Sequence, residues 1–250
     1  MKKIKRLEIF GLVLCVLGLI LLYLLPIYKQ QIYKEDVKTN KGNSTTFKNF
    51  NYDEVPEFDG INATYILNNN IPYFDIGNFQ NDSFEYYSGY DELGRCGNCI
   101  ACIGSELMPK TQREDISEIK PTGWHSVKYE DVIEDGYLYN RCHLIAYQLT
   151  GENANQLNLI TGTRYMNIEG MLPYESKIYF YLTDNKDNHV LYSATPIFIN
   201  NELVCRGVVL EGYSLEDNGK GICFNVFCYN VQPGILIDYL TGESEESKYE

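Results

Sequence analysis

An apolar run near the N-terminus constrains this chain more than any other feature of its sequence. Residues 9–28 contain no charged side chain and consist mainly of Leu, Ile and Val. An α-helix of this length rises about 30 Å, which is roughly the thickness of the hydrocarbon core of a bilayer. The run therefore predicts one transmembrane helix, and the rest of the chain must fold on one side of a membrane.

The charges around the run predict its orientation. Residues 1–8 hold four basic side chains and one acidic one, and basic flanks tend to stay in the cytoplasm. We therefore expect a cytoplasmic flank over 1–8, a signal anchor over 9–28, and everything beyond it outside the cell. Cleavage of the run as a signal peptide is the alternative, and it would give a secreted protein. Residues 24–28 lack the small side chains of a cleavage site, which favours the uncleaved anchor.

Beyond the anchor the composition changes twice. Residues 29–57 are polar and mixed in charge, which predicts a flexible linker. From residue 58 to residue 242 apolar side chains recur regularly, and an acidic tail follows over 243–250. We therefore expect one folded domain over 58–242, because 44% hydrophobic and 14% aromatic residues suffice for a core.

The hydrophobic pattern of this domain predicts strands on both sides of one helical segment. Apolar residues recur at helical spacing over 163–182, with Gly170 and Pro173 expected to divide the helix. Residues 90–124 are rich in turn-forming residues, and the pair Asn200 and Asn201 predicts a tight hairpin. The order of elements predicts an α+β domain with a helix on an antiparallel sheet. The predicted strands cover residues 62–71, 76–79, 137–147, 189–199, 202–214, 222–229 and 232–240.

The net charge limits the kinds of partner. The chain carries −13, and its first 28 residues contribute +3, which leaves −16 on residues 29–250. Proteins that store or shape nucleic acid are normally basic, because neutralisation of phosphates supplies most of their nonspecific affinity. The acidity argues against such a role, but it argues less against an enzyme that must also release its product.

Seven of the eight cysteines lie outside the apolar run, which contains Cys15. Cys96, Cys99 and Cys102 are closely spaced, and such thiolates suit Zn²⁺ or an iron–sulfur cluster. A closed zinc site needs a fourth ligand, and the sequence offers no second pair of cysteines or histidines at ligand spacing. Buried thiols or one local disulfide are therefore favoured over a thiolate-metal or redox module.

Of the three histidines, His143 is the one whose neighbours indicate chemistry. Arg141 lies two residues before it, and side chains two apart share one face of a strand. Two such side chains are costly to bury together, whereas a phosphate site can use both. Cys142 points to the opposite face, which argues against a Cys–His dyad. His125 and His189 are interpreted as structural.

The sequence around His143 resembles the DNA/RNA non-specific endonucleases. Their Asp-Arg-Gly-His strand motif corresponds to Asn140-Arg141-Cys142-His143, and an asparagine and a glutamate eight residues apart correspond to Asn167 and Glu175. The segments 93–95, 121–124 and 229–234 are similar to the membrane-anchored DNA-entry nucleases within that family. The resemblance covers roughly residues 58–242 and implies an antiparallel core with a ββα-metal motif.

The resemblance also implies a mechanism. His143 would be the general base, and Asn167 would bind one Mg²⁺ directly, with Mn²⁺ as a substitute. In an unbroken helix Glu175 lies about 80° around from Asn167, which favours contact through metal-bound water. Arg95 or Arg141 would hold the phosphate, and Asn158 would order the site. The substrate would be extracellular DNA, with RNA as a second candidate. Protein partners are not indicated.

Two departures from the family pattern keep a second function open. Asn140 replaces the usual Asp and removes a negative charge near the site, and Cys142 replaces a Gly. The alternative is a protein of the same fold that captures DNA but cuts it weakly or not at all. The retention of His143, Asn167 and Glu175 together argues for catalysis, because binding alone does not need that set.

Overall fold

The computed structural model describes residues 50–74 and 82–247. The predicted anchor over 9–28 and the predicted strand over 76–79 lie outside these residues. In the part that is described, no helix has the length and apolar character to cross a bilayer. All described residues belong to one unit, Asn49–Glu250.

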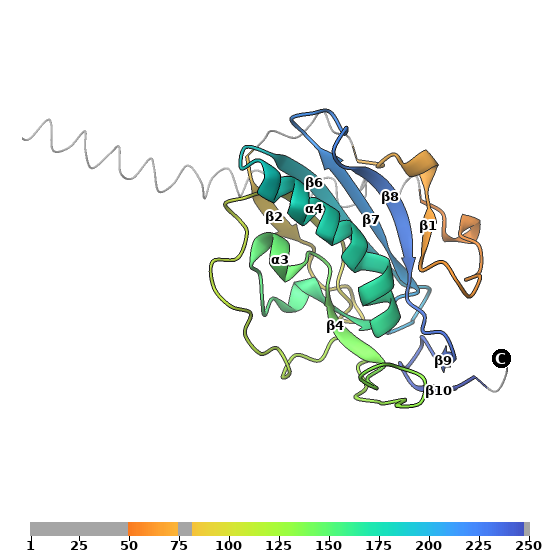
Figure 1. Ribbon diagram of the computed structural model, residues 1–250. Coiled ribbons are helices and arrows are strands. Elements are labelled where there is room, and N and C mark those ends of the chain that lie inside the picture. Colours follow the sequence, from red (N-terminus) through yellow and green to blue (C-terminus); the bar gives the residue numbers. More distant parts are fainter. Residues whose placement is uncertain (1–49, 75–81, 248–250) are drawn as a thin grey trace, which may run out of the picture. The chain divides into compact units, whose positions relative to one another are not determined.

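An antiparallel sheet of six strands forms the centre of this unit, with the strand order β1-β8-β7-β6-β3-β2 (Figure 1). The predicted antiparallel core is thereby confirmed. Strand β3 was not predicted, because its short apolar run stands among the turn residues of 90–124. The strands are β1 Thr64–Ile66, β2 Phe84–Tyr87, β3 Cys99–Gly104, β6 His189–Ile197, β7 Gly207–Ser214 and β8 Cys223–Tyr229.

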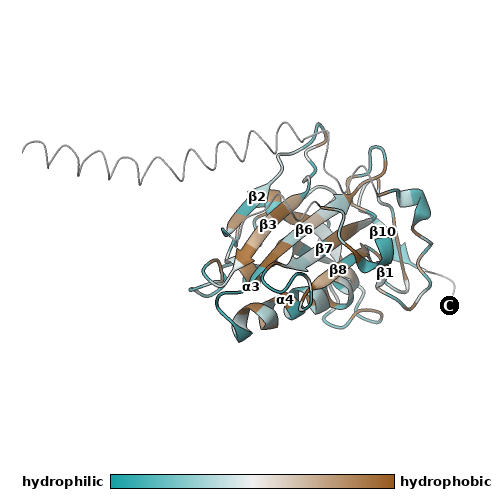
Figure 2. Cartoon of the chain, turned by 90° about the horizontal axis from the view of Figure 1, so that it is seen from above, coloured by the Kyte–Doolittle hydropathy of each residue, from teal (hydrophilic) through white to brown (hydrophobic). Residues whose placement is uncertain are grey.

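One helical stretch covers a face of this sheet (Figures 1 and 2). It consists of a π-helical segment, Met166–Met171, that continues directly into α4, Leu172–Asp184. Ile178 and Leu182 of α4 are fully buried in the main hydrophobic core. The predicted interruption is wrong, because the helical stretch runs on through Gly170 and Pro173, with Pro173 in the first turn of α4.

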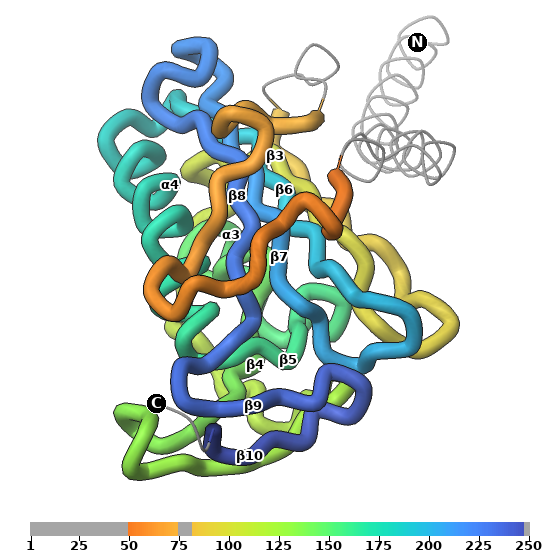
Figure 3. The backbone as a smooth tube through the Cα atoms, turned by 90° about the vertical axis from the view of Figure 1, so that its right-hand side faces the viewer, coloured from red at the N-terminus to blue at the C-terminus, as the bar shows by residue number. Residues whose placement is uncertain are grey.

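The other face of the sheet is covered by the N-terminal part of the described chain. Phe50, Tyr52 and Val55 pack against Phe227 of β8 in a second hydrophobic cluster, and Figure 3 shows this segment crossing the strands. Residues 50–57 therefore belong to the folded unit rather than to the predicted linker. Short 3₁₀ helices in the unit are Tyr52–Glu54, Asn68–Asn70 and Gln156–Asn158.

A second sheet of two strands carries the residues of chemical interest. Strand β4, Tyr139–His143, pairs antiparallel with β5, Leu159–Thr163, so that His143 lies opposite Leu159. The predicted strand over 137–147 is shorter at its C-terminal end, because the short helix α3, Tyr147–Thr150, begins there. The connection from β3 to β4 is the long loop 105–138.

The C-terminal residues form a third sheet. Strands β9, Ile235–Ile237, and β10, Ser244–Glu246, pair as an antiparallel hairpin. Part of the predicted acidic tail is therefore a strand of the folded unit. The predicted tight turn at Asn200 and Asn201 is present, because the Glu202 N–H donates to the Ile199 carbonyl at 3.1 Å, but it lies within the longer segment 198–206 that joins β6 and β7. Asn200 has a left-handed backbone, with φ of 49°.

Candidate active site

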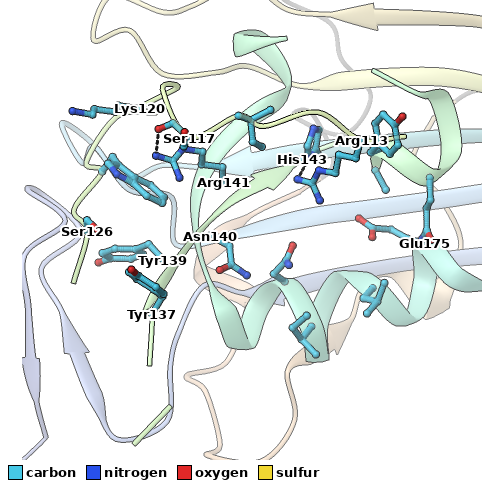
Figure 4. Close-up of a pocket in the computed structure, with 18 residues that line it drawn as sticks. Arg113, Ser117, Lys120, Ser126, Tyr137, Tyr139, Asn140, Arg141, His143 and Glu175 are labelled. Atoms are coloured by element: carbon cyan, nitrogen blue, oxygen red, sulfur yellow. Dashed lines mark hydrogen bonds between the residues drawn. The ribbon is translucent and has the colours of Figure 1, made fainter. Parts of the chain in front are cut away.

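A pocket of about 770 Å³ opens between β4, the π-helical segment, the start of α4 and the 105–138 loop (Figure 4). Four of the six predicted site residues line it. They are Arg141, His143, Asn167 and Glu175. The fold thus brings together residues that are up to 34 positions apart in the sequence.

Strand alternation on β4 decides which side chains reach the pocket. Arg141 and His143 both line it, whereas Cys142 between them is buried in the main core. The Cys142 Sγ atom packs on Gly162 of β5, where an added Cβ would come within 2.5 Å of it. Burial raises the pKa of the Cys142 thiol well above its usual value. The prediction that Cys142 is no nucleophile agrees with this geometry.

The imidazole of His143 is held in one orientation. Its Nε2 atom lies 2.9 Å from the carbonyl oxygen of Asn153. A carbonyl only accepts hydrogen bonds, so Nε2 carries the proton and Nδ1 keeps its lone pair. Nδ1 lies 3.4 Å from the guanidinium of Arg113. The side chain is 7% exposed, and burial, together with the charge of Arg113, lowers its pKa to about 4.

Asn158 does not line the pocket but fixes the chain next to His143. It is completely buried, and its side chain both accepts from the Ile145 N–H and donates to the Ile145 carbonyl. Its own carbonyl accepts from the N–H of Leu144. Asn158 therefore closes the turn at the end of β4 and acts on the pocket only through His143.

The π-helical segment sets the relation between Asn167 and Glu175. A π-turn takes up about one residue more than an α-turn, so eight residues across it rotate about as far as seven in an α-helix. That rotation is about 20° short of two full turns, instead of the 80° offset expected for an unbroken helix. Asn167 and Glu175 thus lie on one side of the helical stretch, and both line the pocket.

Glu175 is a buried carboxyl in this pocket. It is 7% exposed, and burial raises its pKa to about 8, although the charge of Arg113 acts in the opposite direction. A carboxyl in such a place is costly to ionise unless a cation lies nearby. Asn167 is partly exposed, and within the described part of the chain its side chain makes no hydrogen bond, so its amide oxygen is available.

Arg113 is a site residue that the sequence analysis missed. It faces both His143 and Glu175, as Figure 4 shows for the three labelled side chains. Its only signal in the sequence was a positive charge in a turn-rich stretch, and its position depends on how the long 105–138 loop folds back. With Lys120 and Arg141 it gives the pocket three basic side chains against one buried carboxyl, that of Glu175.

Arg141 is fixed by the same loop. It donates to the backbone carbonyls of Ser117 and Ile119, and its guanidinium lies 4.0 Å from the centre of the Trp124 ring. A guanidinium has five N–H donors, so donors remain for a phosphate. The pocket is therefore locally positive on a domain whose overall charge is strongly negative.

A model of the DNA/RNA non-specific endonucleases matches residues 77–214. That match covers more than half of the chain and includes every residue that builds the chemical part of the pocket. The chain belongs to the DNA/RNA non-specific endonuclease family. The family predicted from the motif around His143 is thereby confirmed.

Individual relatives agree with the assignment of the chain to this family. A deoxyribonuclease of Streptococcus dysgalactiae subsp. equisimilis is 33% identical over 112 residues, which is 43% of this chain and 33% of that protein. The chain thus spans about a third of the length of that relative. NucA from Streptococcus agalactiae, solved with magnesium bound, is 26% identical with a TM-score of 0.66, covering 78% of this chain and 93% of that one. The Sda1 nuclease, solved with zinc bound, is 26% identical with a TM-score of 0.64, covering 74% and 97%.

Arg95 lies outside the pocket. It pairs with Asp91 at 2.6 Å and donates to the carbonyls of Asn200 and Glu202 at 2.8 and 2.9 Å. These contacts brace the segment between β6 and β7. Of the two arginines considered for phosphate binding, Arg141 lines the pocket and Arg95 does not.

The three closely spaced cysteines form no metal centre. Cys99 and Cys102 lie three apart on β3 and therefore on opposite faces, and Cys96 donates to the Leu159 carbonyl at 3.2 Å. Burial raises the pKa of the Cys96 thiol to about 11. Among the described residues, no group of three His, Cys, Asp or Glu side chains is arranged to hold a metal. The thiolate-metal interpretation is therefore not supported.

The other two histidines are occupied elsewhere. The Nδ1 atom of His189 lies 2.7 Å from a carboxylate oxygen of Glu216, and the Nε2 atom of His125 lies 3.1 Å from the carbonyl oxygen of Thr241. Neither lines the pocket, and their structural interpretation agrees with these contacts.

Proposed function

We propose that this protein is a Mg²⁺-dependent, sequence-nonspecific endonuclease that hydrolyses phosphodiester bonds of DNA, with RNA as a second candidate substrate. One observation carries the proposal. The pocket brings together His143, whose Nδ1 lone pair is directed into it, with the amide of Asn167 and the buried carboxyl of Glu175 on one helical stretch. Three basic side chains line the same pocket, although the domain as a whole is acidic.

His143 is the general base of this proposal. The Asn153 carbonyl keeps the proton on Nε2, so the proton of an attacking water goes to Nδ1. The lowered pKa keeps the ring neutral, and therefore able to accept a proton, at any pH well above 4. In the free protein Arg113 donates to Nδ1, so it must turn toward the substrate phosphate before the base is available.

The residues of the pocket fit a hydrated divalent ion. Asn167 and Glu175 would hold it, the first through its amide oxygen and the second through its carboxylate or an intervening water. Mg²⁺ keeps several waters and needs few protein ligands, and Mn²⁺ is the expected substitute. When bound, such an ion would neutralise the phosphate and the leaving oxygen. The relatives solved with magnesium and with zinc support a divalent ion in this family.

The arginines supply the remaining charge. Arg113 and Arg141 each present N–H donors to the pocket, and a guanidinium matches the geometry of phosphate oxygens. Asn140, which replaces the usual Asp, adds no negative charge beside them, so the phosphate meets less repulsion there. This arrangement favours contact with the backbone of the substrate, which explains a lack of sequence preference.

We further propose that the protein acts outside the cytoplasm, held by a single-pass anchor over 9–28. Secretion after cleavage is the alternative. A protease added to intact cells should remove a C-terminal tag while a cytoplasmic control protein survives. A tag that resists until the cells are lysed would refute the orientation.

The activity itself is tested with the full-length protein in detergent. Circular plasmid DNA and a structured RNA are incubated with Mg²⁺, with Mn²⁺ and with EDTA, beside His143→Ala as a matched control. Nicking and linearisation that need the metal and are lost in His143→Ala support the proposal. Plasmid that is retained by the protein but stays intact would instead favour the DNA-capture function.

A further inference from the structure

The pocket extends beyond the residues that hydrolysis uses. Figure 4 shows Ser126, Tyr137 and Tyr139 at the end away from His143 and Glu175, with Asn140 between the two ends. The family mechanism described above gives no role to aromatic rings. Their presence at this end therefore needs a separate explanation.

Tyr137 is the most exposed of these rings. Its side chain is 48% exposed, and the ammonium of Lys128 lies 4.5 Å from the ring centre. Tyr137 lines the pocket, whereas Lys128 does not. Lys128 also approaches Glu130 at 3.5 Å, which places it between the carboxylate and the ring. The ring is thus held in place and presented to the pocket.

Trp124 and Lys120 complete this end of the pocket. Trp124 is partly buried, with the guanidinium of Arg141 on one face of its ring. Lys120 is exposed, and it lines the pocket next to Trp124 in the same loop. Two aromatic rings and an exposed cation beside a phosphate site are the elements that proteins use to hold single-stranded nucleic acid.

The loop that presents these rings is fastened to the C-terminal hairpin. The Tyr139 hydroxyl donates to the carbonyl of Gly242 at 2.9 Å, and the Tyr129 hydroxyl lies 2.8 Å from Ser244 Oγ. Gly242 approaches the backbone of Gly123 so closely that a Cβ at Gly242 would lie 2.0 Å from the Gly123 carbonyl oxygen. The rings therefore do not depend on a ligand to be positioned.

We propose that this end of the pocket is a subsite for an unpaired nucleotide next to the scissile phosphate. The base stacks on Tyr137, Trp124 forms the adjoining wall, and Lys120 binds the flanking phosphate. Both faces of a base in a duplex are already covered by its neighbours, so the subsite selects single strands or locally opened duplexes. This inference rests on the proposed function, since it places a substrate strand across the same pocket.

The chain offers an internal probe for the test. Trp124 is its only tryptophan, so fluorescence excited where tyrosine does not absorb reports from the subsite alone. The full-length His143→Ala protein is titrated with a short single-stranded deoxyoligonucleotide and with the same sequence in a hairpin duplex. We expect the single strand to change the Trp124 emission and to bind more tightly than the duplex.

Matched variants in the same background identify the ring. Tyr137→Leu should weaken binding of the single strand about tenfold, whereas Tyr137→Phe should stay within about twofold. Tyr90→Leu is the control, because Tyr90 is 49% exposed and lies outside the pocket. Lys120→Gln should weaken binding and reduce its salt dependence, whereas Lys220→Gln should not. Unchanged affinity in Tyr137→Leu, or equal losses in Leu and Phe, would overturn the subsite.

The outcome is separable from that of the proposed function. Binding that depends on the Tyr137 ring, in a protein that cleaves nothing in its wild-type form, would refute the nuclease but support the subsite. Metal-dependent cleavage that is insensitive to Tyr137→Leu, with equal KM for single strand and duplex, would support the nuclease but refute the subsite.

Discussion

The two ends of the pocket are built in different ways. The chemical end consists of β4, the π-helical segment and α4, and the residues beneath it, Met166, Met171 and Ile178, are fully buried in the main core. The aromatic end is carried by the 105–138 loop, which rests on a small separate cluster. Proton transfer requires a fixed geometry, whereas binding of many sequences tolerates a loop. The fold therefore fixes the chemical end more firmly than the aromatic end.

The electrostatics differ in the same direction. At the chemical end, burial lowers the pKa of His143 to about 4 and raises that of Glu175 to about 8, so both groups are neutral in the metal-free protein at neutral pH. At the aromatic end, Lys120 is exposed to solvent. The chemical end can therefore accept a proton and a metal ion, whereas the aromatic end attracts the negative phosphates of the substrate.

The largest effect is expected at the chemical end. His143→Gly should lower kcat by roughly 10²–10⁴-fold and change KM little, because only the general base is lost. Free imidazole should restore part of the rate, increasingly as pH rises through its own pKa, and it should do nothing for Asn167→Ala. Steady-state kinetics on an oligonucleotide measures both. Near wild-type turnover in His143→Gly would refute the mechanism.

The next effect concerns the π-helical segment. Insertion of one alanine after the exposed Glu169 should rotate Asn167 by about 100° relative to Glu175, because each added helical residue turns the chain by that angle. Cleavage should then fall as far as in Asn167→Ala, while far-UV circular dichroism stays unchanged because α4 and the sheet remain. The control is Glu169→Ala, which keeps the register and should keep the activity. An insertion variant with full activity would show that the register is irrelevant.

The buried carboxyl of Glu175 should lower the folding stability of the metal-free protein, although it serves the proposed metal site. Its folded pKa of about 8 exceeds its ordinary value of 4.5, so the folded state binds more protons between these limits. The metal-free wild type should therefore lose stability as pH rises from about 4.5 to 8. Glu175→Gln removes this loss and should be more stable by a few kcal/mol at alkaline pH, as judged by urea unfolding. Mg²⁺ should stabilise the wild type more than the variant, and equal Mg²⁺ responses would argue against Glu175 as part of the metal site.

The sequence predicted most residues of the chemical end but almost none of the aromatic end. His143, Asn167 and Glu175 could be found because local spacing on one strand and one helix determines their arrangement. The π-turn could not, since it changes the helical register without a sequence signal that we recognised. Arg113 and the support from β10 depend on long-range packing of the 105–138 loop. Arg95 was placed in the site by resemblance alone, whereas its contacts to Asp91 and the β6–β7 segment have no local signature.

The smallest effect comes from a matched pair of tyrosines, one beneath each end. Tyr192 donates its hydroxyl to the carbonyl of Leu144, beside His143, and Tyr139 donates to that of Gly242, both at 2.9 Å. Replacing either by Phe leaves one buried carbonyl without its partner and should cost about 1 kcal/mol of folding stability.

The two variants should nevertheless differ kinetically. Tyr192→Phe loosens the chain next to the base and should lower kcat by a few fold with KM unchanged. Tyr139→Phe releases the first residue of β4, where the loop that carries Trp124 and Tyr137 ends, from the C-terminal hairpin, and should raise KM for single-stranded DNA with kcat unchanged. Thermal unfolding and steady-state kinetics of both proteins decide the matter. If both variants change the same kinetic constant, the two ends are not independent, and the division between chemistry and binding proposed for this pocket is wrong.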